Sequence, residues 1–113
     1  MEDFIKINES NEMTVFLSGE LDHHGVALIR GEIDERLFFS KPSVLIFELS
    51  DVEFMDSSGL GLILGRYART SALGIPIVIR NPSKRHERLF KMAEMQNIVK
   101  IEKGEKYENE KNH

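Results

Sequence analysis

The stretch from Val44 to Gly61, VLIFELSDVEFMDSSGLG, decides the fold because it joins a buried strand to a helix. Residues 44–49 are nearly all apolar, which is typical of a strand buried on both faces of a sheet. A helical repeat follows, and it predicts an apolar stripe that packs on the sheet, formed by Leu60, Ile63, Leu64, Tyr67 and Ala68. The hydroxyls of Ser57 and Ser58 therefore stand where the chain enters this helix.

The flanking sequence alternates between strand and helix patterns. Strands are predicted at residues 4–7, 13–17, 75–79 and 99–101, and helices after Asp22, from Ser57 to Leu73, and after Ser83. Asp22 is expected to cap the first helix, Gly74 to end the second, and Gly19 to end the second strand. An initial hairpin followed by this alternation predicts an α/β fold, a mixed sheet of about five strands with helices packed on it.

Composition limits the class of protein. The chain has 113 residues, 41% apolar, which suits one domain over residues 1–102 with a polar, flexible tail at 103–113. A formal charge of −4 without a basic stripe argues against nucleic acid as a partner. An acidic N-terminus and the lack of a long apolar run argue against a signal peptide or a membrane span, and the chain has no cysteine. We expect a cytoplasmic protein without a membrane partner.

Spacing excludes several chemistries at the serine turn. A P-loop needs lysine and a hydroxyl residue after its glycines, but Gly61 and Gly65 are followed by leucine and arginine. Gly59, Gly61 and Gly65 match a dinucleotide fingerprint poorly, because the third glycine falls one position late. A nucleophile elbow needs glycine two residues on either side of the serine, and neither Ser57 nor Ser58 has that pair. No acidic pair follows the first strand, so a receiver-type phosphoaspartate is also disfavoured.

Two interpretations of the turn stay open at this point. In the first, a serine accepts a phosphate from another protein's kinase, and the helix N–H groups and dipole stabilise the added charge. In the second, Ser57 or Ser58 only caps the helix while Asp56 supports the turn. Glycines at 59, 61 and 65 each cost on the order of 1 kcal/mol of helix propensity. That cost indicates a contact surface, either inside the domain or with a partner.

Other side chains receive weaker assignments. Leu62, Arg66 and Arg69 are spaced as a ridge opposite the predicted apolar stripe, where they would face a partner. His23 and His24 are adjacent and lack a third ligand at suitable spacing, so a polar helix start is expected there and no metal site. An unrelated hypothesis is a small hydrolase or nucleotide-binding domain that uses Ser57 with His23, His24 or His86.

Three segments together resemble the anti-sigma factor antagonists of the STAS domain family. They are Gly19–His24, Phe54–Tyr67 and Arg88–Met92, and the likeness covers nearly the whole chain. The His-His pair and the Gly-Arg-Tyr run are most similar to the sporulation branch that acts on sigma-F. The general-stress branch is the alternative.

The resemblance implies a function that spacing does not supply. Members of the family bind an anti-sigma factor that is also a serine kinase, a dimer carrying ATP or ADP, and so release the sigma factor. Phosphorylation of the serine after the aspartate, here Ser57, ends binding, and a PP2C-type phosphatase restores it. Such a protein is not an enzyme and needs no cofactor. The resemblance and the spacing arguments together give the residues expected to bind the partner. They are Asp22, His23, Asp56, Ser58, Gly59, Gly61, Leu62 and Arg66.

Overall fold

A five-stranded sheet and three helices make up the computed structural model, which describes residues 3–104. The strands are β1 (Ile5–Ile7), β2 (Glu12–Leu21), β3 (Val44–Met55), β4 (Ile77–Arg80) and β5 (Lys100–Glu102). The helices are α1 (His23–Ser40), α2 (Ser57–Ala72) and α3 (Lys84–Met92), with a short 3-10 turn, η1 (Met95–Asn97), before β5. The predicted tail beyond Gly104 lies outside the described residues.

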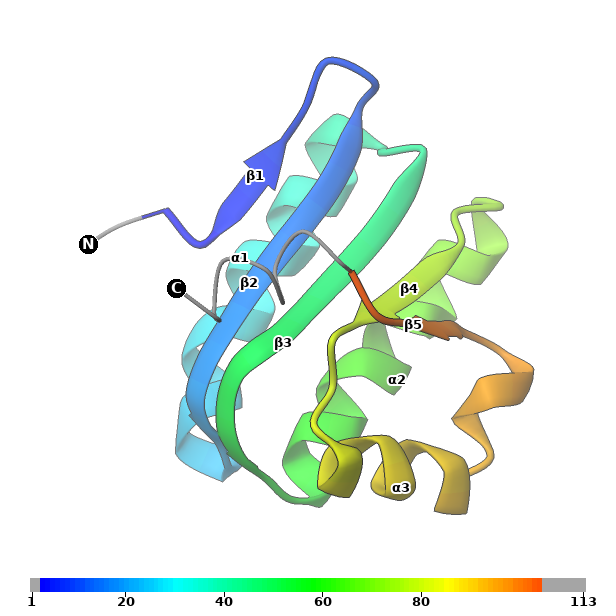
Figure 1. The fold of residues 1–113 in the computed structure, drawn as a ribbon. Helices are drawn as coiled ribbons and strands as arrows, with labels where there is room; N and C mark the ends of the chain where they lie inside the picture. The colour runs from blue at the N-terminus through cyan, green and yellow to red at the C-terminus, as the bar shows by residue number, and fades with distance from the viewer. Residues whose placement is uncertain (1–2, 105–113) are drawn as a thin grey trace.

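The strands lie in the sheet in chain order, β1-β2-β3-β4-β5. β1 is antiparallel to β2, and every later pair is parallel. Figure 1 shows α1 and α2 on one side of this sheet, with α3 beyond the end of β4. The predicted mixed α/β architecture is confirmed. Within residues 3–104, no helix is both long enough and apolar enough to cross a bilayer.

β2 and β3 are longer than the sequence pattern predicts. Gly19 does not end β2: with φ +71 it adjoins a register shift, and the strand continues to Leu21. β3 likewise continues past Leu49 to Met55. Polar residues 50, 51 and 53 hide this extension, although Val52 and Met55 within it are buried. The two extensions pair with each other, ending at Leu21 and Met55.

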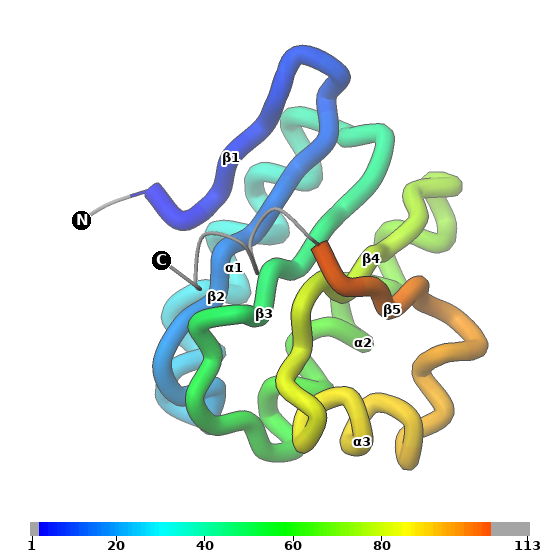
Figure 2. Tube along the Cα trace, in the orientation of Figure 1, coloured from blue at the N-terminus to red at the C-terminus, as the bar shows by residue number. Residues whose placement is uncertain are grey.

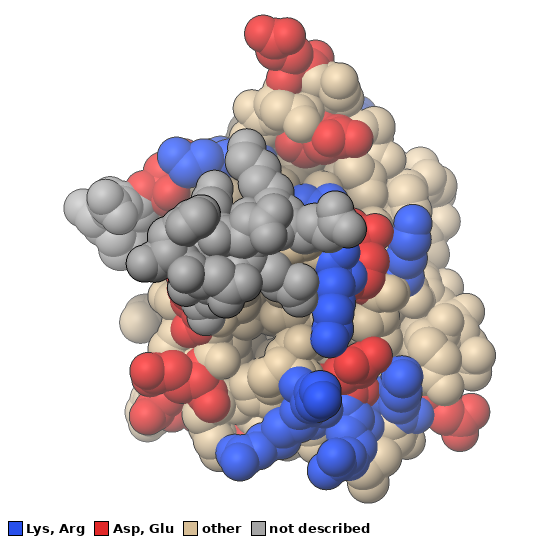
Figure 3. Space-filling view, viewed as in Figure 1, with Lys and Arg blue, Asp and Glu red and all other residues tan. Residues whose placement is uncertain are grey.

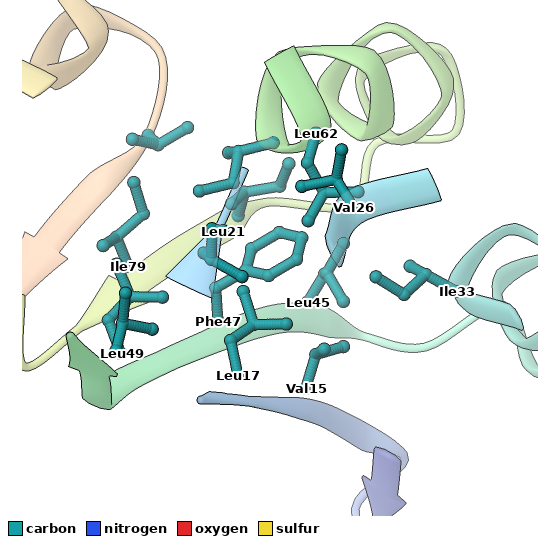
Figure 4. Close-up of a cluster of buried hydrophobic side chains, with 14 of the residues drawn as sticks. Val15, Leu17, Leu21, Val26, Ile33, Leu45, Phe47, Leu49, Leu62 and Ile79 are labelled. Carbon is teal, nitrogen blue, oxygen red and sulfur yellow. The ribbon is translucent and has the colours of Figure 1, made fainter. Parts of the chain in front are cut away.

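The core fills the layer between the sheet and the helices. Phe47 of β3 is fully buried and lies at the centre of the cluster in Figure 4. Side chains from β2, α1, β3, α2 and β4 surround it, among them Leu17, Leu21, Val26, Ile33, Leu45, Leu49, Leu62 and Ile79. On α3 the buried side chains are His86 and Phe90, whereas Met92 is 75% exposed. The core thus packs the first turns of α1 and α2 on the ends of β2 and β3.

Gly59 lets α2 approach these extensions closely. A Cβ atom at this position would lie 2.5 Å from Met55 Cγ and 3.3 Å from Leu21 Cβ. At Gly61, by contrast, a Cβ would meet nothing within 4 Å. Of the two possibilities raised by the sequence, Gly59 therefore serves an internal contact and Gly61 faces outward.

Gly59→Ala is expected to lower the free energy of unfolding by about 1–3 kcal/mol, because the methyl group overlaps Met55. Gly61→Ala is the matched control and should raise it by up to about 1 kcal/mol, since alanine is the better helix residue and space is open. Urea unfolding followed by far-UV circular dichroism measures both. Equal stability of the two variants would contradict the close packing of α2 on Met55.

His86 predicts a pH dependence of stability. It is 2% exposed, and its Nδ1 has no hydrogen-bond partner among the described residues. Burial, and to a smaller extent the charge of Arg85, lower the pKa of His86 below its ordinary value of 6.5. The folded state therefore holds the imidazole neutral, and the unfolded state takes up the proton first as the pH falls.

The stabilising contribution of neutral His86 is present above pH 6.5 and should be lost as the pH falls from there toward the lower folded-state pKa. The free energy of unfolding, measured in urea at pH values across this window, should fall more for the wild type than for His86→Gln. His23→Gln is the control, since His23 is exposed and the wild-type dependence should remain. An identical pH dependence in wild type and His86→Gln would exclude this role of His86.

Candidate functional site

The starts of α1 and α2 form one site because the strands before them are paired. Leu21 and Met55 are direct partners at the end of the β2–β3 ladder, so Asp22 and Asp56 follow neighbouring residues. Figure 2 shows the two chain traces running side by side to the end of the sheet at which both helices begin. The structure therefore brings together the turns at Asp22 and Asp56.

Each turn is closed by its aspartate. Asp22 Oδ1 accepts a hydrogen bond from Gly25 N at 2.9 Å, and Asp56 Oδ1 accepts one from Ser58 N at 2.8 Å. Both aspartates have extended backbone, as N-cap residues do. The prediction that Asp22 caps its helix is confirmed. The interpretation in which Ser57 or Ser58 caps α2 is wrong, because Asp56 is the cap.

With Asp56 as the cap, the two serines occupy different environments. Ser57 is the first residue of α2 and is exposed, whereas Ser58 is half-buried. Within residues 3–104, neither serine hydroxyl has a hydrogen bond, so the two serines differ in exposure alone. Spacing left the two hydroxyls equivalent and the family resemblance favoured Ser57; the structure makes Ser57 the more accessible of the two.

A phosphate on the Ser57 hydroxyl would lie at the positive end of the α2 dipole. The first N–H groups of a helix have no intrahelical partner and suit an anion. In this turn the Ser58 N–H donates to Asp56 Oδ1, and the Gly59 and Leu60 N–H groups donate to the Asp56 carbonyl oxygen. Because Ser57 is exposed, an added phosphate would lie at the surface and outside the core.

The expected ridge on α2 is wrong for two of its residues. Leu62 is 3% exposed and belongs to the core, and Arg66 is 5% exposed. Arg66 Nε lies 2.8 Å from Asp34 Oδ1 of α1, and its Nη1 donates to the Leu62 carbonyl at 3.1 Å. Burial lowers the pKa of Arg66, and the charge of Asp34 opposes that shift. These residues join the two helices and do not face a partner.

The true buried stripe of α2 is Gly59, Leu62, Ile63, Arg66 and Thr70. Leu64 and Ala68, which the sequence placed on the buried side, are exposed. The sequence analysis placed the buried stripe on the wrong side of α2 because it took Arg66 for a surface residue. Asp34, a carboxylate in the preceding helix that can pair with Arg66, was the signal for its burial.

The histidines do not extend the site chemically. His23 and His24 are exposed, with ring centroids 6.0 Å apart. Among residues 3–104, no group of three potential metal-ligating side chains is present. His86 is buried in α3, and no hydrogen bond of the described residues joins a histidine to Ser57. The arrangement lacks the nucleophile–base contact that the hydrolase hypothesis requires.

The chain is similar to several curated bacterial proteins. It is 37% identical over 81 residues to the anti-sigma F factor antagonist of Lysinibacillus sphaericus, covering 72% of this chain and 69% of the relative. It is 36% identical over 100 residues to that of Paenibacillus polymyxa, covering 88% and 81%. The anti-sigma-B factor antagonist of Bacillus subtilis is 30% identical over 97 residues, covering 86% of both chains.

Two solved structures of the antagonist SpoIIAA have the same fold. The unphosphorylated form is 29% identical with a TM-score of 0.74, covering 96% of this chain and 94% of that one. The phosphorylated Bacillus form is 28% identical with a TM-score of 0.73, covering 96% and 97%. The model of the STAS domain matches residues 5–107. The chain therefore belongs to the STAS domain family.

Proposed function

We propose that this protein is an anti-sigma factor antagonist, a binding protein and not an enzyme, switched off by phosphorylation of Ser57. The observation that carries the proposal is the exposed Ser57 hydroxyl directly after the cap Asp56, beside the start of α1. The relatives named for antagonism of an anti-sigma factor support the partner class.

The proposed switch acts through surface charge. A phosphoserine adds roughly −1.5 to −2 charges and three acceptor oxygens. SpoIIAA has been solved in both phosphorylation states, and this chain matches the two forms equally well, with TM-scores of 0.73 and 0.74. This similarity supports a change in the docking surface without a change of fold.

The proposed docking surface contains the accessible residues of both helix starts. These are Asp22, His23, Asp56, Ser57, Ser58 and Gly61. Gly59 contributes indirectly, because its missing side chain sets how closely α2 packs on Met55. The partner is the cognate anti-sigma factor, a dimeric serine kinase carrying ATP or ADP, and a PP2C-type phosphatase reverses the modification. All three would act in the cytoplasm.

Sigma-F is the proposed sigma factor. The two relatives named for anti-sigma F antagonism are 36–37% identical to this chain, against 30% for the anti-sigma-B antagonist of Bacillus subtilis. Regulation of a general-stress sigma factor is the second candidate.

Ser57→Asp is expected to weaken binding to the purified anti-sigma factor by at least about tenfold, because it places a fixed negative charge in the docking surface. The variant should remain folded, since an acidic side chain in the first turn of a helix is favourable. Ser57→Ala should bind like the wild type but take up no phosphate in the presence of ATP. Titration calorimetry measures the binding, and intact-protein mass spectrometry measures the phosphate.

Ser58→Ala is the matched control, one position further along the same turn. It should still be phosphorylated, at Ser57, by the kinase. Phosphate on Ser57→Ala but not on Ser58→Ala would move the acceptor to Ser58. Absence of phosphate and of binding in the wild type would overturn the proposed function as a whole.

A further inference from the structure

The outward face of α3 is strongly basic. Lys84, Arg88 and Lys91 follow each other at i, i+4 and i+7, with Arg85 alongside, and all four are exposed. His86 and Phe90 point the other way into the core. Figure 3 shows this cluster of Lys and Arg side chains over α3 on the face viewed there. The expectation of a chain without a basic stripe is therefore wrong at α3, although the formal charge of the whole chain is −4.

Most of this charge is not neutralised within the domain. Lys91 Nζ lies 3.3 Å from Glu87 Oε2, one turn earlier on the same helix. Across residues 3–104, no ion pair involves Lys84, Arg85 or Arg88. These three cations are therefore available to an external anionic group.

Two of these cations also stand at an unfavourable position. Lys84 and Arg85 occupy the first turn of α3, directly after the cap Ser83, where the helix dipole is positive and favours anions. The charge of Arg85 also disfavours protonation of the neighbouring His86. Within the domain, the positive charges of Lys84 and Arg85 are therefore in an electrostatically unfavourable position. Negative charge on a partner would offset this repulsion.

The basic face lies at the same end of the sheet as the proposed docking surface. β3 and β4 are parallel, so α2 and α3 both begin beyond the same edge of the sheet. In the orientation shared by Figures 1 and 2, α2 and α3 both begin at the same end of the sheet. A protein that covers Ser57 from outside is therefore positioned to reach the start of α3.

We infer that Lys84, Arg85 and Arg88 form a second contact region of the docking surface, and that they bind an acidic segment on the anti-sigma factor. This inference rests on the proposed function and names a further region of that site. Arginine suits carboxylates in particular, because its planar guanidinium donates two parallel hydrogen bonds. The overall negative charge of the chain favours a protein partner over nucleic acid or an anionic membrane.

The test compares two double variants with the same change of charge. Arg85→Glu/Arg88→Glu reverses the basic face, and Lys6→Glu/Arg30→Glu reverses two exposed cations on β1 and α1. Association with the purified anti-sigma factor is measured by stopped-flow fluorescence at low and at high ionic strength. The α3 variant should associate about tenfold more slowly at low ionic strength and depend less on salt. The control variant should associate within about twofold of the wild type.

Each alternative outcome is decisive. Equal association of the two double variants would overturn the inference, and so would binding of wild-type protein to phosphatidylserine vesicles together with unchanged association of the α3 variant. Circular dichroism and thermal unfolding verify that the variant is folded, which is expected because glutamate at position 85 suits the helix dipole. If the wild type neither bound the anti-sigma factor nor became phosphorylated by it, that result would instead refute the proposed function.

Discussion

The pairing of β2 with β3 beyond the central sheet is the constraint on which the rest depends. It ends with Leu21 opposite Met55, so the caps Asp22 and Asp56 follow two neighbouring residues. Two helices then begin at one edge, each with its first turn closed by a carboxylate. Without these extensions, the acidic turns would be separate loops and would not form a common surface.

Packing sets the position of α2 on the strand ends, while the outer surface of both helix starts stays exposed. A Cβ at Gly59 would collide with Met55, which fixes how closely α2 can lie on the strands. Further along the helices, the buried pair of Arg66 and Asp34, 2.8 Å apart, joins α2 to α1. Removing one partner of such a pair leaves an uncompensated buried charge, so the pair favours a single arrangement of the two helices. Ser57 lies outside this packed region, and a change in its charge need not disturb it.

The features predicted correctly from the sequence are those that short-range sequence patterns determine. The mixed sheet, the cap at Asp22 and the helix end near Gly74, where φ is +73, follow from periodicity and from the residues that favour such positions. The features that the sequence analysis missed depend on tertiary contacts. The ends of β2 and β3 were hidden by polar residues on the outer side of the strands, and Arg66 was placed outside because its partner Asp34 lies on another helix. The difference between the two serines also depends on the fold, because Ser57 is exposed and Ser58 is half-buried at the start of α2.

The central claim is that the two helix starts form one surface for the anti-sigma factor. Amide chemical-shift perturbation on the isotopically labelled domain tests it most directly, with the purified anti-sigma factor and ADP added stepwise. The account predicts that the perturbed amides cluster at residues 22–25 and 56–61. Perturbations confined to the opposite end of the helices, around Lys41 and Leu73, would contradict it.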